Sequence, residues 1–175
     1  EGASQESDCV LCAAGKYSNS AGATEEDACA LCLPGTYAED EGTYDCVRCP
    51  AGTFSTDYGS NSSTTCLKCV AGTFSDVRGA ASNATCRGCG AGKYGATEGS
   101  AAEGACVPCP AGTYSPSPGA TACIACGAGK YLETLGNDNE TDCVLCRIGK
   151  YSTAVGATEC RLVHILSAWE AHGQR

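Results

Sequence analysis

The sequence predicts a small disulfide-rich repeat fold, an elongated rod of short, irregular β-hairpin and loop units with little regular secondary structure. Three observations support this prediction. The chain has 17 Cys among its 175 residues, eight C-x2-C pairs recur along it, and large apolar side chains are scarce. Cys at this density is typical of small secreted scaffolds, in which crosslinks replace burial as the main source of order.

The composition does not supply a conventional hydrophobic core. The 43% of residues counted as hydrophobic is inflated by Ala and Cys, while Met is absent, Phe occurs twice and Trp once. A chain of this length with more large apolar residues would form one ordinary domain around a single core. We therefore expect covalent crosslinks to set the shape, in an oxidising compartment that is extracellular or at the cell surface.

The charge balance argues against nucleic acid as a partner. Net charge is −9, with 11 Lys plus Arg against 20 Asp plus Glu, and no basic run is present to displace counterions from a phosphate backbone. No apolar stretch approaches the length needed to span a bilayer, so direct membrane insertion is not expected. The chain begins with Glu1 rather than Met, and we expect a processed product or a fragment.

Eight repeats organise the chain. Counted from the second Cys of each C-x2-C pair, the third residue is Gly, the fifth is Tyr or Phe, and the tenth is again Gly in every repeat. Each unit reads C-x2-G-[KT]-[YF]-x4-G-x3–6-C, and successive pairs start 17 or 20 residues apart. The pairs begin at Cys9, Cys29, Cys46, Cys66, Cys86, Cys106, Cys123 and Cys143.

These markers predict the local structure of a unit. A Gly that is obligatory at one place indicates a positive φ or a close backbone approach. The run around the aromatic residue favours an extended strand and the second Gly favours a reversal, so each unit is expected to form a disulfide-closed hairpin. One aromatic residue near a crosslink is enough to cover a disulfide and a turn, and such units can stack only in a line. The aromatic residues are Tyr17, Tyr37, Phe54, Phe74, Tyr94, Tyr114, Tyr131 and Tyr151.

The markers also divide the chain into segments. A lead-in at 1–11 precedes the repeats and a divergent tail at 161–175 follows them, because Val163 stands where the next Cys is required. The tail has apolar residues at helix-like spacing, which indicates either a short amphipathic cap or an altered, unstructured end. These apolar residues are Leu162, Ile165, Leu166 and Trp169. The repeats are 12–31, 32–48, 49–68, 69–88, 89–108, 109–125, 126–145 and 146–160.

Two segments carry a resemblance to known families. CPAGTYSPSPGATAC at residues 109–123 and CGAGKYLETLGNDNETDC at residues 126–143 resemble the cysteine-rich repeats of the ephrin-receptor-like type. They are also similar to the cysteine-rich modules of tumour necrosis factor receptors. The similarity runs from about Cys9 to Cys160 and is specific, because Cys, Gly, an aromatic residue and Gly recur eight times in fixed order.

The resemblance implies a disulfide pairing in which the second Cys of each pair bonds to the first Cys of the next pair. Cys9 is then unpaired or bonded to another chain, because its partner would lie in a preceding unit. A rival scheme interlaces the pairs, joining Cys9 to Cys29 and Cys12 to Cys32, and leaves Cys160 alone. We favour the forward scheme, although sequence does not fix connectivity. It joins Cys12 to Cys29, Cys32 to Cys46, Cys49 to Cys66, Cys69 to Cys86, Cys89 to Cys106, Cys109 to Cys123, Cys126 to Cys143 and Cys146 to Cys160.

Metal binding is the main alternative chemistry. The intervals of 13 or 16 residues between C-x2-C pairs also match the spacing of a zinc ribbon. The Gly-aromatic-Gly pattern in every interval and the absence of basic recognition faces favour disulfides, so no metal is expected. Acidic clusters at 25–27, 39–41 and 138–142 contain the oxygen ligands that Ca²⁺ uses, but such runs are more commonly solvated faces.

We do not expect an enzyme, and no cofactor is expected. A Cys or Ser nucleophile needs a positioned base, and the two His residues, His164 and His172, both follow the repeats. Thioredoxin-like exchange needs one C-x2-C at the start of a helix in an α/β fold, whereas the eight pairs here lie among Gly and turn residues.

Three N-glycosylation sequons occur, at Asn61, Asn83 and Asn139. Each Asn lies in a 20-residue unit, three to five residues before a repeat Cys. The extra residues of the long units are expected to form an outward bulge, where a bulky glycan costs little packing. We therefore expect N-linked glycans at these three residues.

Two functions are compatible with this pattern. The first is a structural one, a stalk, filament or matrix subunit, because the variable positions are mostly small or polar and offer few anchors for a ligand. Self-association into a larger assembly is then expected, through Cys9 or through stacked ends. The second is the ligand-binding ectodomain of a cell-surface receptor, which the resemblance implies. Fold-level analogy does not carry function, so we favour the first. The receptor contacts would be Tyr44, Tyr58, Val77 and Arg78.

Overall fold

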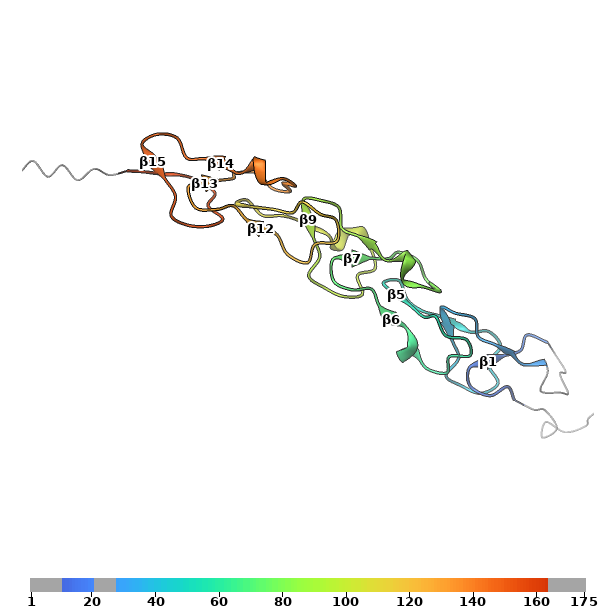
Figure 1. The fold of residues 1–175 in the computed structure, drawn as a ribbon. Coiled ribbons are helices and arrows are strands. Elements are labelled where there is room, and N and C mark those ends of the chain that lie inside the picture. The colour runs from blue at the N-terminus through green and yellow to red at the C-terminus, as the bar shows by residue number, and fades with distance from the viewer. Residues whose placement is uncertain (1–10, 21–27, 164–175) are drawn as a thin grey trace, which may run out of the picture.

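The chain forms a thin rod along which the repeats follow one another in sequence order (Figure 1). The computed structural model describes residues 11–20 and 28–163. Over these ranges the regular structure consists of eight two-stranded antiparallel sheets and a few short 3-10 turns. The predicted fold class is therefore confirmed. None of the described segments forms a helix with the length and apolar character that a membrane crossing requires.

Each repeat supplies one hairpin. The first strand contains the aromatic marker and the residue before it, and the second strand is the pair of residues inside the next C-x2-C. Thr and aromatic residues favour such pleated positions. The pairs are β1 (Lys16–Tyr17) with β2 (Ala30–Leu31), β3 (Thr36–Tyr37) with β4 (Val47–Arg48), β5 (Thr53–Phe54) with β6 (Leu67–Lys68), β7 (Thr73–Phe74) with β8 (Arg87–Gly88), β9 (Lys93–Tyr94) with β10 (Val107–Pro108), β11 (Thr113–Tyr114) with β12 (Ile124–Ala125), β13 (Lys130–Tyr131) with β14 (Val144–Leu145) and β15 (Lys150–Tyr151) with β16 (Arg161–Leu162).

The extra residues of the long units form 3-10 turns just before the closing Cys. In three of the four described turns a side chain caps the start: Ser62, Ser82 and Asn139 each accept a hydrogen bond from a backbone N–H two residues on. These polar caps satisfy donors that a short turn leaves without backbone partners. The turns are η3 (Ser63–Thr65), η4 (Asn83–Thr85), η5 (Glu103–Ala105) and η6 (Glu140–Asp142).

The eighth repeat is longer than the sequence indicates. The expected tail begins at 161, but Arg161 and Leu162 form β16 and pair with β15. Val163 N also donates to Gly149 O at 3.0 Å, which is the bond that the second Cys makes in the other repeats, as Cys146 N does to Gly129 O. The bond uses only the backbone, so Val replaces Cys there without disturbing the hairpin. The rest of the expected tail, 164–175, lies outside the described residues.

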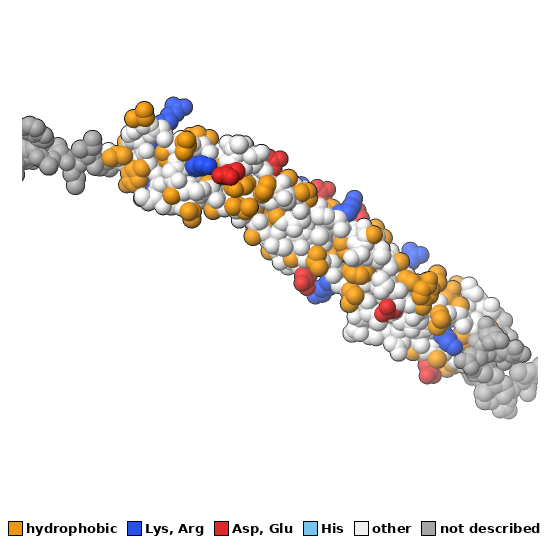
Figure 2. All heavy atoms as spheres, in the orientation of Figure 1, with side chains coloured by type: hydrophobic (Ala, Val, Ile, Leu, Met, Phe, Trp, Pro, Cys, Tyr) orange, Lys and Arg blue, Asp and Glu red, His pale blue; other side chains and the backbone are white. Residues whose placement is uncertain are grey.

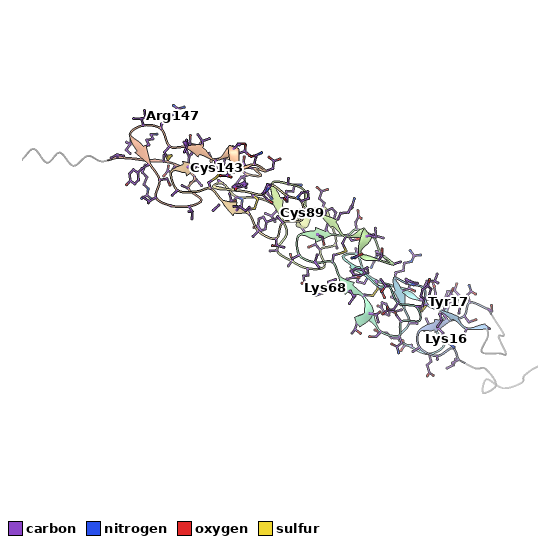
Figure 3. The ribbon with its side chains drawn as sticks, viewed as in Figure 1. Lys16, Tyr17, Lys68, Cys89, Cys143 and Arg147 are labelled. Carbon is purple, nitrogen blue, oxygen red and sulfur yellow. A yellow bond between two sulfur atoms is a disulfide. The ribbon has the colours of Figure 1, made fainter. Side chains whose placement is uncertain are left out.

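Eight disulfides provide most of the buried interior. Their pairs are those of the forward scheme, Cys12–Cys29 to Cys146–Cys160, and not those of the interlaced scheme. The largest side chains buried almost completely are Cys and Ser. Cys89 and Cys143 lie within the width of the rod, whereas Arg147 projects from it (Figure 3). Cys9 lies outside the described residues.

The aromatic residue of one repeat packs on the disulfide of the next. Phe74 of repeat 4 forms a buried cluster with Cys89 and Cys106, which are bonded to each other in repeat 5. Tyr114 of repeat 6 packs in the same way against the cluster that contains Cys126 and Cys143 of repeat 7. The small cores therefore lie between repeats, and a single repeat cannot complete its own core.

Backbone hydrogen bonds join each repeat to the next. Between repeats 3 and 4, Gly79 N donates to Cys49 O at 2.8 Å, Gly52 N to Ser75 O at 2.8 Å, and Ser55 N to Ala80 O at 3.0 Å. The first of these bonds recurs at every junction between described repeats, from Gly42 N to Cys12 O through Gly156 N to Cys126 O. The junctions therefore have the same geometry whatever side chains they carry.

The first Gly of a repeat also touches the repeat two positions further along. Gly52 has a φ of 83°, which Gly adopts readily and other residues rarely, and it closes the turn before β5. In addition, a Cβ on Gly52 would overlap the carbonyl oxygen of Gly99 in repeat 5. The corresponding Gly of repeats 1, 2, 4, 5 and 6 has the same contact with a Gly carbonyl two repeats on. This contact, in addition to the turn, excludes any side chain.

A matched pair of substitutions separates these two requirements. Gly72 and Gly129 have φ values of 83° and 80°, but a Cβ on Gly72 overlaps Gly119 O, whereas nothing lies within 4 Å of a Cβ on Gly129. Both Ala variants lose about 1–2 kcal/mol from the positive φ. Gly72→Ala is expected to lose about 1–3 kcal/mol more, the usual cost of overpacking. Guanidinium unfolding of the oxidised proteins measures the difference. Equal losses would show that the contact between alternate repeats contributes nothing.

Candidate functional surfaces of the rod

The surface of the rod has no single dominant patch on the face that Figure 2 presents. Apolar, acidic and basic side chains lie there in small groups along the length of the rod (Figure 2). The strands of each hairpin are only two residues long, so most large apolar residues of the second strands stay half exposed, as Val47 and Leu67 do. Candidate functional features must therefore be judged one at a time.

The three sequon residues are all exposed. Asn61 precedes the cap of η3, Asn83 is the first residue of η4, and Asn139 is the cap of η6. In Figure 1 the turns η3 and η4 lie on opposite edges of the rod. The expected outward bulge of the long units is thus present, and successive repeats present it on different sides.

Asn139 has the most defined geometry of the three. Its Oδ1 accepts hydrogen bonds from Thr141 N at 3.0 Å and from Thr141 Oγ1 at 2.9 Å, and its backbone N–H donates to Asp142 Oδ2 at 3.1 Å. The Nδ2 nitrogen, to which a glycan is attached, makes no hydrogen bond within the part of the chain that the structure describes. The capping interactions therefore hold the side chain while leaving the reactive nitrogen accessible.

The acidic clusters serve as caps and ion-pair partners. Asp142 completes the cap of η6, and Glu140 pairs with Lys130 Nζ at 3.2 Å. Glu39 Oε1 accepts a hydrogen bond from Ser63 N at 2.8 Å, so a carboxylate of repeat 2 caps η3 of repeat 3. This backbone hydrogen bond lowers the pKa of Glu39. Within the described ranges no three His, Cys, Asp or Glu side chains converge to hold a metal ion, and the cluster at 25–27 lies outside them.

Sequence reasoning missed the role of the Lys or Thr that precedes each aromatic marker. Lys93 pairs with Glu103 at 3.2 Å, just as Lys130 pairs with Glu140, so each Lys reaches the 3-10 turn of its own long repeat. Where Thr occupies the place, its hydroxyl bonds the carbonyl three residues earlier, as Thr53 does with Pro50 at 2.7 Å. The signal was the restriction of this position to Lys and Thr.

The residues expected to contact a receptor ligand are exposed but dispersed. Tyr44 lies in repeat 2, Tyr58 in repeat 3, and Val77 and Arg78 in repeat 4; the two Tyr are 73% and 68% exposed. Among the described residues, no hydrogen bond, ion pair or ring contact joins any two of them. Arg87, which the sequence did not indicate, lies over the ring of Phe74 with its guanidinium carbon 4.9 Å from the ring centre.

Comparison with known families identifies two matching stretches. Residues 23–66 and 98–143 match a family model described as tyrosine-protein kinase ephrin type A/B receptor-like. Together they cover just over half of the chain. Each stretch contains one complete 17-residue repeat and the disulfide-closed loop of the 20-residue repeat that follows it. No curated protein sequence matches the chain.

Proposed function

The chain belongs to the ephrin-receptor-like family of cysteine-rich repeats, and we propose that it is an extracellular structural protein. In this proposal it is a disulfide-stapled, glycosylated stalk, filament or matrix subunit that keeps other parts of an assembly apart. The family match and the eight disulfides both support a place outside the cell or at its surface, where disulfides persist.

The observation that carries this proposal is the uniform junction between repeats. The same backbone bond, from the second Gly of one repeat to the Cys carbonyl of the previous one, occurs at every described junction. Contacts of this kind extend a rod regardless of side-chain identity. The variable positions are mostly small or polar, so the rod offers few large side chains as anchors for a ligand. Length is the property that such an arrangement provides.

Glycans and self-association complete the proposal. N-linked glycans on Asn61, Asn83 and Asn139 would surround the rod, since these residues are exposed on its bulges. Cys9 remains without a partner in the forward scheme, which uses the other 16 Cys. We propose that Cys9 bonds to another chain and so builds a larger assembly.

A receptor ectodomain is the second candidate, and the description of the matching family favours it. The exposed rings of Tyr44 and Tyr58 are the kind of side chain that anchors an interface. A receptor depends on particular repeats, whereas a spacer depends on their number. The length of a rod that lacks one repeat and the bonding state of Cys9 therefore test the first function.

Deletion of residues 69–88 removes repeat 4 as one complete unit and joins Lys68 to Cys89. Because every junction uses the same backbone groups, the shortened protein is expected to stay folded and to form a rod shorter by one repeat. Electron microscopy and solution scattering of the secreted protein measure the length, and non-reducing electrophoresis detects Cys9-linked chains that Cys9→Ser abolishes. Compact particles, or a strictly monomeric protein with a free Cys9 thiol, would contradict the proposal.

Secretion from a eukaryotic host tests the glycans. Asn61→Gln, Asn83→Gln and Asn139→Gln are each expected to remove one glycan, seen as one step in electrophoretic mobility that enzymatic deglycosylation also produces. Asn137→Gln is the control, because Asn137 lies two residues before Asn139 in the same loop and is not part of a sequon. If the secreted wild-type protein carried no glycan at any of the three residues, glycan display would be excluded from the proposed function.

A further inference from the structure

A loop of repeat 6 presents a Ser hydroxyl between two Pro residues. Ser117 is the only Ser or Thr of the chain with Pro on both sides, namely Pro116 and Pro118. Ser117 and both Pro are exposed, whereas Ser115 at the start of the loop is only 1% exposed. Of the two hydroxyls in this loop, only that of Ser117 is therefore accessible.

The backbone of this loop is held at its two ends. Ser115 N donates to Asn137 O at 3.0 Å at one end, and Gly119 N donates to Cys89 O at 2.8 Å at the other. Among the described residues, the stretch 116–118 makes no backbone–backbone hydrogen bond. Exposed loop tips of this kind are accessible to modifying enzymes and proteases. An enzyme can thus bind these three residues without breaking a hydrogen bond between backbone groups of the rod.

The side chain of Ser117 is also without internal partners. Within the ranges that the structure describes, its Oγ makes no hydrogen bond, and the bond that reaches Ser117 runs from Ser115 Oγ to its carbonyl oxygen at 3.4 Å. The ring of Pro116 fixes φ at that residue, and Pro118 disfavours helical backbone at Ser117. Little conformational entropy is therefore lost when an enzyme binds this segment in an extended form.

The neighbouring repeats leave the Gly119 side of this loop uncovered. At every other second Gly that the structure describes, the residue just before the Cys that opens an earlier repeat lies within 4 Å of the place of a Cβ. For repeat 6 the corresponding residue is Gly88, and nothing lies within 4 Å of a Cβ on Gly119. The loop thus has room beside it for a bulky group. Examples of the covered arrangement are Leu31 beside Gly59, Arg48 beside Gly79 and Lys68 beside Gly99.

We propose that Ser117 is an O-glycosylation site, to which a transferase attaches a sugar from a nucleoside diphosphate sugar donor. Ser117 Oγ attacks the anomeric carbon of the donor, a glycosidic bond replaces the bond from that carbon to the phosphate oxygen, the nucleoside diphosphate leaves, and the hydroxyl proton passes to a base of the transferase. Ser- and Thr-rich segments that contain Pro are typical carriers of O-linked sugars on extracellular stalks. The site lies in the interval between Asn83 and Asn139, which contains no sequon. It goes beyond the N-linked glycans of the proposed function and does not depend on them.

Mass spectrometry of the protein secreted from a eukaryotic host tests the site. After enzymatic removal of N-linked glycans, the wild-type protein is expected to keep the mass of at least one sugar, and Ser117→Ala is expected to lose that sugar. Thr97→Ala is the matched control and is expected to keep it. Thr97 has the same place in repeat 5 and is exposed, but Ala96 and Glu98 flank it instead of Pro.

Fragmentation of the tryptic peptide 94–130, which contains both Ser117 and Thr97, locates the sugar. A peptide without a sugar, or one whose sugar lies on another residue, would overturn the proposal. Ser117→Ala is expected to keep the eight disulfides and the chromatographic size of the wild-type protein, because the Ser117 hydroxyl makes no hydrogen bond in the described part of the rod. An unmodified Ser117 in a protein that carries its N-linked glycans contradicts this inference alone and leaves the proposed function unchanged.

Discussion

The close approach of glycine backbones in alternate repeats is the constraint on which the rest of the structure depends. The first Gly of a repeat receives the carbonyl of the second Gly two repeats later, and the second Gly in turn donates its N–H to the Cys carbonyl of the preceding repeat. Each repeat is thereby fixed to its two successors. The aromatic residue then fills the space over the next disulfide, as Phe74 does over Cys89–Cys106. The regular spacing of Cys, Gly and aromatic residues follows from this geometry.

Disulfides stabilise the loop within each repeat, whereas backbone hydrogen bonds hold neighbouring repeats together. Each disulfide closes a loop within one repeat, the bonded positions being 14 or 17 residues apart in the sequence, and the chain-entropy model assigns about 3 kcal/mol to such a loop. Among the described repeats, no disulfide joins one repeat to another, so consecutive repeats are connected covalently only through the backbone of a C-x2-C pair. Stiffness along the rod must therefore come from the backbone bonds and the small aromatic clusters between repeats.

The fold class and the hairpin of each unit could be predicted from the sequence because they depend on local markers such as the Gly at 52 and the aromatic residue at 54. The contact between Gly52 and Gly99 could not be predicted, because it joins residues of two non-adjacent repeats. The turn alone already requires Gly at position 52, so the contact adds no further signal to the sequence. The placement of Phe74 on the next disulfide was missed for the same reason. Leu162 is one of the apolar residues at helix-like spacing in the expected tail, but it lies in β16 and pairs with β15, because the backbone pairing does not depend on that pattern. The exposed positions of Asn61, Asn83 and Asn139 agree with the expected bulge. The repeat boundaries already placed Tyr44, Tyr58 and Arg78 in three different repeats, and among the described residues no hydrogen bond, ion pair or ring contact joins them.

The central claim is that backbone contacts between repeats, together with the disulfides, hold the rod. Hydrogen exchange of the oxidised protein tests it most directly at Gly79 and Gly99, whose amides donate only to the preceding repeat, to Cys49 O and Cys69 O. The account predicts slow exchange at these two amides that is lost on reduction. Exchange as fast as in an unstructured chain, with all eight disulfides intact, would contradict it.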